Sequence, residues 1–194
     1  MATTIAIING HPDPIKGHLS AALAEAYGAG AAEAGHEVRR IDVADLDFPL
    51  LRTATDFETG TPVAAIAEAQ ETIREADHLL IVYPLWLGTM PALLKGFLEQ
   101  VFRPTFAFTR DTGRWPASLL KGRSARIVVT MGMPAFVYRW YFGAHSLKSL
   151  ERNILKFVGI GPIRTTLFGM TGAADDQKRQ AWLEKMRALG RRGV

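Results

Sequence analysis

The chain has 194 residues, 48% of them apolar and 22% charged, which suits one globular domain over residues 1–194 and is too short for two full-sized ones. The absence of cysteine excludes disulfides, a thiolate nucleophile and a cysteine-based zinc site, and no other metal site is predicted. The formal net charge is +4, but the aromatic residues are not interleaved with the basic ones, so no nucleic-acid partner is expected.

The N-terminal segment leads into an apolar strand without a basic region or a cleavage site, so no signal peptide is expected. The most apolar stretch, Leu79–Leu94, is interrupted by Pro84 and Pro91. It is also shorter than the roughly 20 residues that a bilayer requires. We therefore expect a cytoplasmic protein without a membrane span.

Short β-rich runs alternate along the chain with longer stretches of helical composition. The predicted strands are Thr4–Asn9, Glu37–Val43, His78–Tyr83, Ala125–Met131 and Arg164–Phe168. The predicted helices are Leu19–Ala34, Val63–Glu75, Ala92–Phe102, Leu147–Val158 and Asp176–Leu189. This alternation predicts βαβ units and a parallel sheet with helices on both faces.

Two of the runs, Ile5–Ile8 and Leu79–Val82, are apolar without alternation, as is typical of strands buried on both faces. The five predicted strands in one domain favour an α/β three-layer sandwich with the flavodoxin-like strand order 2-1-3-4-5. In this fold, ligands bind beyond the carboxyl ends of the strands. The long irregular stretches Leu46–Pro62 and Arg103–Arg123 are expected to cover a site or an interface.

The first loop that carries chemistry follows the first strand, over Asn9–Ser20. It lacks the G-x-G-x-x-G pattern of a dinucleotide turn. It offers the imidazoles of His11 and His18, the amine of Lys16, the Ser20 hydroxyl and backbone N–H groups at a helix N-terminus. These groups suit a phosphate or pyrophosphate, although an ordinary polar loop is an equally good interpretation.

The second loop follows the third strand and leads into a helix at Pro91, where a missing N–H costs nothing. Pro84 and Pro91 favour an extended loop, and Trp86 and Leu87 within it are large apolar side chains. They indicate a flat apolar ligand beside the loop, or else a contribution to the core. The third loop, Thr130–His145, is rich in aromatic residues that pack either on a ligand or on a partner chain.

Several of these motifs together resemble one known family. The run from Pro84 through Phe102 closely resembles the signature of the NAD(P)H dehydrogenase (quinone) family, flavodoxin-like flavoproteins that include the quinone reductases and the modulator-of-drug-activity type. Asn9–Pro12, Asp47–Leu50 and Phe106–Phe108 are similar too, so that the resemblance extends from the first strand to about Gly161.

The resemblance implies a bound flavin, either FMN or FAD, and assigns residues to it. The phosphate would be held by His11, His18, Leu19 and Ser20. The ring would lie along Pro84, Leu85, Trp86, Leu87 and Gly88, with its polar edge at Thr130, Met131 and Gly132. Catalysis would depend on Tyr138 and His145, and the acceptor pocket would be lined by Phe106, Phe108 and Tyr138. Met131 and Met133 depart from the Thr and Gly of many members.

The function implied is ping-pong hydride transfer from NAD(P)H through the flavin to a quinone or a similar flat acceptor. A homodimer is expected to bury the aromatic side chains of two connections, namely Phe106, Phe108, Trp115, Phe136, Trp140, Tyr141 and Phe142. An azo- or nitro-reductase and a regulatory ancillary subunit of a potassium efflux system are the alternatives. An electron carrier is disfavoured, because such carriers are strongly acidic. The preference for NADH or NADPH stays open, with Arg39, Arg40 and Arg139 as possible partners of a 2′-phosphate.

Overall fold

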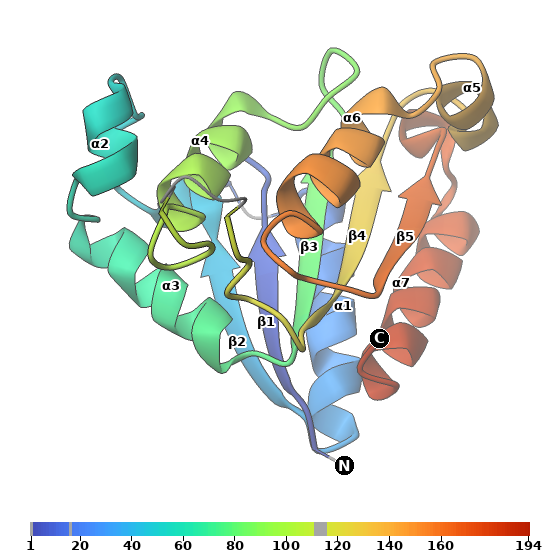
Figure 1. Ribbon diagram of the computed structural model, residues 1–194. Coiled ribbons are helices and arrows are strands. Elements are labelled where there is room, and N and C mark those ends of the chain that lie inside the picture. The colour runs from blue at the N-terminus through green and yellow to red at the C-terminus, as the bar shows by residue number, and fades with distance from the viewer. Residues whose placement is uncertain (1, 16, 111–115) are drawn as a thin grey trace.

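The computed structural model describes residues 2–15, 17–110 and 116–194. A five-stranded parallel sheet forms its centre, in the order β2-β1-β3-β4-β5 (Figure 1). The strands are β1 (Thr4–Asn9), β2 (Glu37–Asp42), β3 (His78–Pro84), β4 (Ser124–Thr130) and β5 (Ile163–Phe168). The structure therefore confirms the predicted α/β class, strand order and flavodoxin-like arrangement.

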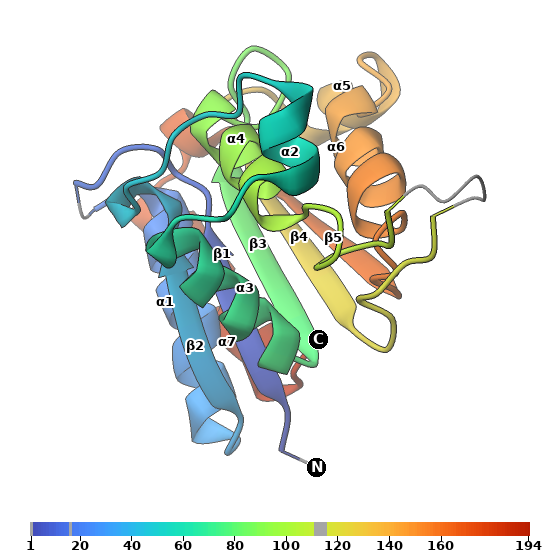
Figure 2. The same ribbon diagram turned by 60° about the vertical axis from the view of Figure 1, so that its left-hand side comes forward.

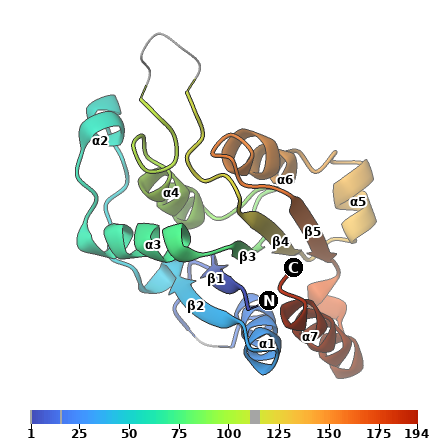
Figure 3. The ribbon, with the colours of Figure 1, turned by 60° about the horizontal axis from the view of Figure 1, so that its bottom comes forward.

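Helices cover both faces of the sheet, as Figure 3 shows along its edge. One face carries α1 (Leu19–Glu33) and α7 (Asp176–Arg191). The other carries α3 (Ala64–Glu75), α4 (Ala92–Val101) and α6 (His145–Ser149), which continues into the π-helical segment η2 (Leu150–Leu155). The short helices α2 (Ala54–Thr59) and α5 (Ala135–Trp140) lie near the carboxyl ends of the strands (Figures 1 and 2). Two 3-10 turns are η1 (Val43–Asp45) and η3 (Thr171–Ala173).

The core has two halves because successive side chains of each strand point to opposite faces. In β1, Ile5 and Ile7 pack with α1 and α7, whereas Ala6 and Ile8 pack toward α3 and α4. All four are at most 1% exposed. Burial on both faces explains why the strand reads as a continuous apolar run.

Glycine lets α1 and α7 approach each other closely. A Cβ on Gly30 would overlap the carbonyl oxygen of Arg187, and a Cβ on Gly190 would overlap that of Tyr27. Both glycines therefore serve the packing of the two helices.

The structure adds two helices where the sequence predicts irregular chain. For α2 the local signal is present, because the Thr53 hydroxyl accepts a hydrogen bond from the Asp56 N–H at 3.0 Å, as an N-cap does. For α5 the chain enters through Pro134, and no side chain caps the helix. Its six residues are too few for a periodicity to show.

A buried arginine fastens the segment after β2 to the end of α4. The Arg103 guanidinium is 6% exposed and donates to the carbonyls of Asp56 and Gly60 at 2.9 and 2.8 Å. It also donates to Gln100, whose amide reaches the Pro49 carbonyl. Burial lowers the pKa of Arg103. The stretch 46–62 is thus held from within the chain by side-chain donors to its carbonyls.

At the amino end of the sheet, His78 is buried at 1% exposure beside Tyr27 and bonds Ser124 Oγ through Nδ1 at 2.7 Å. Burial lowers its pKa from 6.5 to about 4, and the positive charges of Arg126 and Arg164 add to the effect. The folded state therefore favours the neutral imidazole.

Because the pKa of His78 is lower in the folded than in the unfolded chain, its contribution is present above pH 6.5 and is lost as the pH falls toward 4. We expect the free energy of unfolding to fall by about 3 kcal/mol more in the wild type than in His78→Gln over this interval. Urea unfolding of both proteins at pH 7 and pH 4.5 measures the difference. Equal losses in the two proteins would show that His78 does not titrate on unfolding.

Candidate functional site

The three loops predicted to carry chemistry follow β1, β3 and β4, which are neighbours in the sheet. The strand β1 pairs with β2 on one side and with β3 on the other. After β2 the chain therefore crosses back over β1 and adds its later strands on the opposite side, so that the strand order reverses between β1 and β3. The carboxyl edge at such a reversal is where ligands bind in open α/β sheets.

The first loop is organised by two stacked histidines. The rings of His11 and His18 lie 3.8 Å apart, and the edge of His11 meets Trp86 of the second loop at 5.9 Å. His18 Nε2 bonds the Asp13 carboxylate at 3.0 Å. Burial lowers the pKa of His11, and the positive charge of a protonated His18 adds to the effect. The Ile15 N–H, followed by His18, holds the pKa of Asp13 below its ordinary value. The edge-to-face contact of His11 with Trp86 joins the first loop to the second.

The N-terminus of α1 begins where this loop ends, and no side chain caps it. Within the described part of the chain, the N–H groups of Leu19, Ser20 and Ala21 find no acceptor outside the helix. Ser20 Oγ is buried and also lacks a partner. A helix N-terminus with free N–H groups and a buried hydroxyl is suited to an anion such as a phosphate. Lys16, also predicted for this role, lies outside the described residues.

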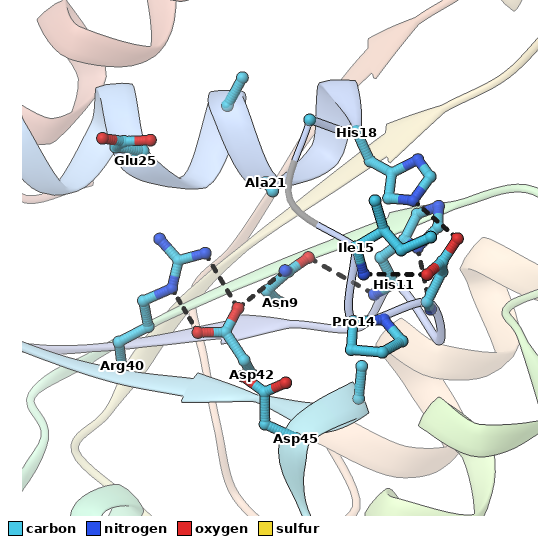
Figure 4. A pocket seen from close by; sticks show the side chains of 14 residues that line it. Asn9, His11, Pro14, Ile15, His18, Ala21, Glu25, Arg40, Asp42 and Asp45 are labelled. Carbon is cyan, nitrogen blue, oxygen red and sulfur yellow. Dashed lines mark hydrogen bonds and ion pairs between the residues drawn. The ribbon is translucent and has the colours of Figure 1, made fainter.

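A polar cleft of about 530 Å³ flanks the first loop on the β2 side (Figure 4). Asn9 Nδ2 donates to Asp42 at 2.8 Å, and Arg40 bonds the same carboxylate at 2.6 and 2.9 Å. The carboxylates that line the cleft are those of Asp13, Glu25, Asp42 and Asp45, against the single guanidinium of Arg40 among the described lining residues. The carboxylates disfavour a phosphate on their side of the cleft, whereas His11 and His18, which also line it, lie beside the start of α1.

The second loop contains a tight two-residue turn. Trp86 and Thr89 exchange both backbone hydrogen bonds at 2.9 Å, and the two residues between them, Leu87 and Gly88, have φ of 45° and 78°. A leucine in the left-handed region is strained, and its side chain is fully exposed. Trp86 is 49% exposed. This loop therefore leaves apolar surface open rather than filling the core.

Backbone hydrogen bonds fix the starts of the second and third loops. The Leu85 N–H donates to the Thr130 carbonyl at 2.8 Å, and the Met131 N–H donates to the Phe168 carbonyl at 2.9 Å. Within the described residues, the N–H groups of Leu87, Gly88 and Gly132 find no acceptor. Thr130 and Met131 are buried, whereas Gly132 is exposed. Backbone N–H donors thus remain free at the tips of both loops, where they could bind the polar edge of a flat ligand.

Tyr138 does not face open space in this structure. It is 1% exposed, its hydroxyl shares a hydrogen bond with Ser146 Oγ at 2.8 Å, and it accepts the Leu147 N–H at 3.2 Å. This placement does not support the expected donation to a flavin or an acceptor, which stays a prediction. The exposed imidazole of His145, at the first residue of α6, lies against Gly143. Tyr138 therefore anchors the start of the helix that carries His145.

The structure separates the aromatic residues predicted for an acceptor pocket and a dimer interface. Phe106 is 8% exposed, with the Arg74 guanidinium over its ring at 5.2 Å. Phe108 packs edge to face on Phe157 at 5.0 Å and lines an apolar groove of about 340 Å³ between α4 and η2. Phe106 is thus buried within its own chain and Phe108 is partly exposed in the groove, so their part in an acceptor pocket or an interface stays a prediction. Trp115 lies outside the described residues.

The aromatic residues of the third loop remain uncovered. Phe136, Trp140, Tyr141 and Phe142 are 67%, 81%, 82% and 50% exposed. These exposed side chains are gathered on one short helix and the turn after it, as is typical of surfaces that bind ligands or partners. No described helix is long and apolar enough to cross a membrane.

Comparisons with known proteins agree with this geometry. Residues 3–189 match the Flavodoxin_2 family, whose description is flavodoxin-like fold. An uncharacterized NAD(P)H oxidoreductase of Haemophilus influenzae is 29% identical over 182 residues, which cover 92% of this chain and 89% of the relative. The human ribosyldihydronicotinamide dehydrogenase [quinone] is 28% identical over 136 residues, 64% of this chain and 57% of the human protein.

The structure also resembles solved structures of oxidoreductases with the same fold. The NAD(P)H:quinone oxidoreductase of Methanothermobacter marburgensis has a TM-score of 0.79 at 25% identity, covering 98% of this chain and 96% of that one. An FMN-dependent NADH-azoreductase of Bacillus anthracis in complex with FMN has a TM-score of 0.75. At 18% identity, covering 98% of both chains, it shows likeness in fold alone.

The position of Tyr138 predicts a structural effect of its hydroxyl. In Tyr138→Phe, the Leu147 N–H and the Ser146 hydroxyl lose a buried partner, so we expect the free energy of unfolding to fall by about 1–3 kcal/mol. Tyr141→Phe, at an exposed ring, should change it little and is the matched control. Chemical denaturation measures both. An unchanged stability in Tyr138→Phe, together with slower flavin reduction, would favour the donor role instead.

Proposed function

The chain belongs to the Flavodoxin_2 family of proteins with the flavodoxin-like fold, and from that premise we propose that it is a flavoprotein that oxidises NAD(P)H and reduces a quinone or a similar flat acceptor. The likeness to the archaeal NAD(P)H:quinone oxidoreductase supports this reaction class. The observation that carries the proposal is a single edge where an uncapped helix N-terminus, with the buried hydroxyl of Ser20, meets the exposed Trp86 loop.

The residues of the first loop fit a flavin phosphate. The N–H groups at the start of α1 and Ser20 Oγ would hold its oxygens, and His11 would flank it. The side chain of His18 is already bonded to Asp13, so its proposed contribution is the backbone at the helix start together with Leu19. We propose FMN rather than FAD, because a second phosphate at this end of α1 would approach the carboxylates of the neighbouring cleft.

The second and third loops fit the flat ring. Pro84, Leu85 and Trp86 would provide an apolar wall, and the free N–H groups of Leu87, Gly88 and Gly132 would donate to the polar edge beside Thr130 and Met131. These donors belong to the backbone, so their positions are set before a ligand arrives. Preset donors stabilise developing charge without reorganisation.

A flavin held by these loops would supply the redox chemistry that couples oxidation of NAD(P)H to two-electron reduction of the acceptor, which takes up the equivalent of one hydride and one proton. The protein would contribute position and a proton. His145 is proposed to hold or release that proton at its exposed imidazole. Tyr138 is proposed as a positioning residue, because its hydroxyl fixes Ser146 and Leu147 next to His145.

The choice of acceptor would depend on the shape of the site rather than on any one residue. A quinone suits a flat apolar wall with backbone donors at its rim. An azo compound is the second candidate acceptor, favoured by the fold shared with the azoreductase. A cytoplasmic location and a homodimer are part of the proposal, and an ancillary role beside a potassium efflux system is the competing one from another class.

Removal of the Ser20 hydroxyl tests flavin binding directly. We expect Ser20→Ala to weaken FMN binding about 5- to 150-fold, which corresponds to about 1–3 kcal/mol for one lost hydrogen bond to phosphate. His11→Ala should weaken it as well. Ser149→Ala, on the exposed side of α6, is the matched control. Quenching of flavin fluorescence gives the affinities. If the wild type binds neither FMN nor FAD at micromolar concentration, the proposed function is wrong.

The exposed pair Tyr141 and Phe142, whose rings meet edge to face at 5.0 Å, is the proposed centre of a two-fold interface. We expect a dimer by light scattering and a folded, flavin-binding monomer for Phe142→Asp. Leu119→Asp, which also places charge on an exposed apolar side chain, should remain a dimer. A monomeric wild type with full activity would contradict the interface.

A further inference from the structure

A groove of about 310 Å³ lies beyond the third loop, between α5, the outer strand β5 and α7. Its lining includes Phe136, Arg139, Trp140 and Lys185 beside the β5 residues 165–167. The described residues that line it include two cationic side chains and no acid. It is therefore the opposite in charge of the acidic cleft beside the first loop.

The side chains of α5 present one face to this groove. Phe136, Arg139 and Trp140 are spaced i, i+3 and i+4, which places them together on a helix surface. Tyr138 points the other way, into the core, and its hydrogen bonds fix the rotation of the helix. Tyr141 and Phe142 follow the helix end and are not part of the lining. The packing of α5 therefore keeps the rings of Phe136 and Trp140 exposed in the groove.

The structure discriminates among the arginines that could bind a phosphate. Arg39 is paired with Glu37 at 2.9 Å and with Glu75, and Arg40 is paired with Asp42. Arg139 takes part in no ion pair among the described residues. Lys185 is held beside the groove by the ring of Phe168, 5.7 Å from its Nζ. Among Arg39, Arg40 and Arg139, only Arg139 therefore has a positive charge that no acidic side chain among the described residues compensates.

An exposed indole beside a guanidinium and an amine is the combination that recognises a purine nucleotide. Aromatic faces stack with bases, and the planar fork of arginine matches phosphate oxygens. We propose that this groove binds the 2′-phosphoadenosine end of NADPH, with adenine on Trp140 and the 2′-phosphate between Arg139 and Lys185. The proposal rests on the proposed function, since it presupposes a pyridine nucleotide as donor, and it makes NADPH the preferred one.

The groove and the flavin loops lie at the same edge of the sheet. Ala135, which lines the groove, follows Gly132 by three residues, a chain length of at most about 11 Å. The six residues of α5 then rise about 9 Å. Figure 1 shows α5 at the carboxyl edge, next to the end of β5. A dinucleotide with its nicotinamide at the third loop would run along this edge with its adenosine toward α5.

Binding of nucleotide fragments tests the groove without any turnover. The flavin-loaded protein is titrated with 2′,5′-ADP and with 5′-AMP by calorimetry, with inorganic phosphate as a further probe. We expect 2′,5′-ADP to bind about ten-fold or more tightly than 5′-AMP, the size of one charge-assisted hydrogen bond. Arg139→Gln and Lys185→Gln should each remove this difference, whereas Arg39→Gln, at a paired arginine, should leave it. Equal affinity of the two fragments in the wild type, or an unchanged preference in Arg139→Gln, overturns the proposal.

Steady-state kinetics then separates this proposal from the proposed function. In Arg139→Gln, kcat/KM for NADPH should fall about ten-fold or more while that for NADH stays unchanged. If the wild type oxidises neither nucleotide but still prefers 2′,5′-ADP, the groove is right and the proposed function is wrong. If it oxidises NADH and NADPH equally well, the proposed function survives and the groove assignment fails. A dimer that binds neither fragment would mean that a second copy covers Trp140, which also overturns it.

Discussion

The arrangement of this protein depends on strands that are buried on both faces. Because α1 and α7 cover one face of the sheet and α3, α4 and α6 cover the other, the inner strands β1, β3 and β4 present no functional side chain from their middle. Chemistry is therefore confined to the edges, and above all to the carboxyl edge where β1, β3 and β4 end side by side. The order of the strands decides which loops meet, and here it joins three loops that are far apart in sequence.

At that edge the backbone decides what a ligand can use. Some N–H groups are consumed by the sheet, as when Leu85 donates to Thr130 and Met131 donates to Phe168. Others are left without an acceptor within the described chain, at the start of α1 and at Leu87 and Gly132. The strained turn of the second loop leaves both of its central N–H groups, those of Leu87 and Gly88, without an acceptor among the described residues. Donors of this kind need no side-chain ordering when a ligand binds.

The strands could be predicted from the sequence because apolar runs of β-formers report burial directly. The loops could be located for the same reason, as the segments that follow those runs. Contacts between distant segments could not. Nothing near Tyr138 signals that its hydroxyl meets Ser146 and the Leu147 N–H, and nothing near Phe106 signals the guanidinium of Arg74 above it. The same holds for Arg103, whose carbonyl partners lie more than 40 residues away. A sequence motif identifies residue types, whereas these roles follow from packing.

Charge is distributed unevenly along the functional edge, and the asymmetry gives it a direction. On the β2 side, the described lining of the cleft beside the first loop carries four carboxylates and one arginine. On the β5 side, the groove under α5 carries Arg139 and Lys185 among aromatic rings, with no acid among its described lining. An anionic ligand that engages the end of α1 is repelled from the first and attracted to the second. With a net charge of only +4, this polarity arises from where the charges lie rather than from how many there are. Under the proposed function, this asymmetry would orient a phosphorylated ligand along the edge from β1 toward β5, across the loops that offer free backbone donors.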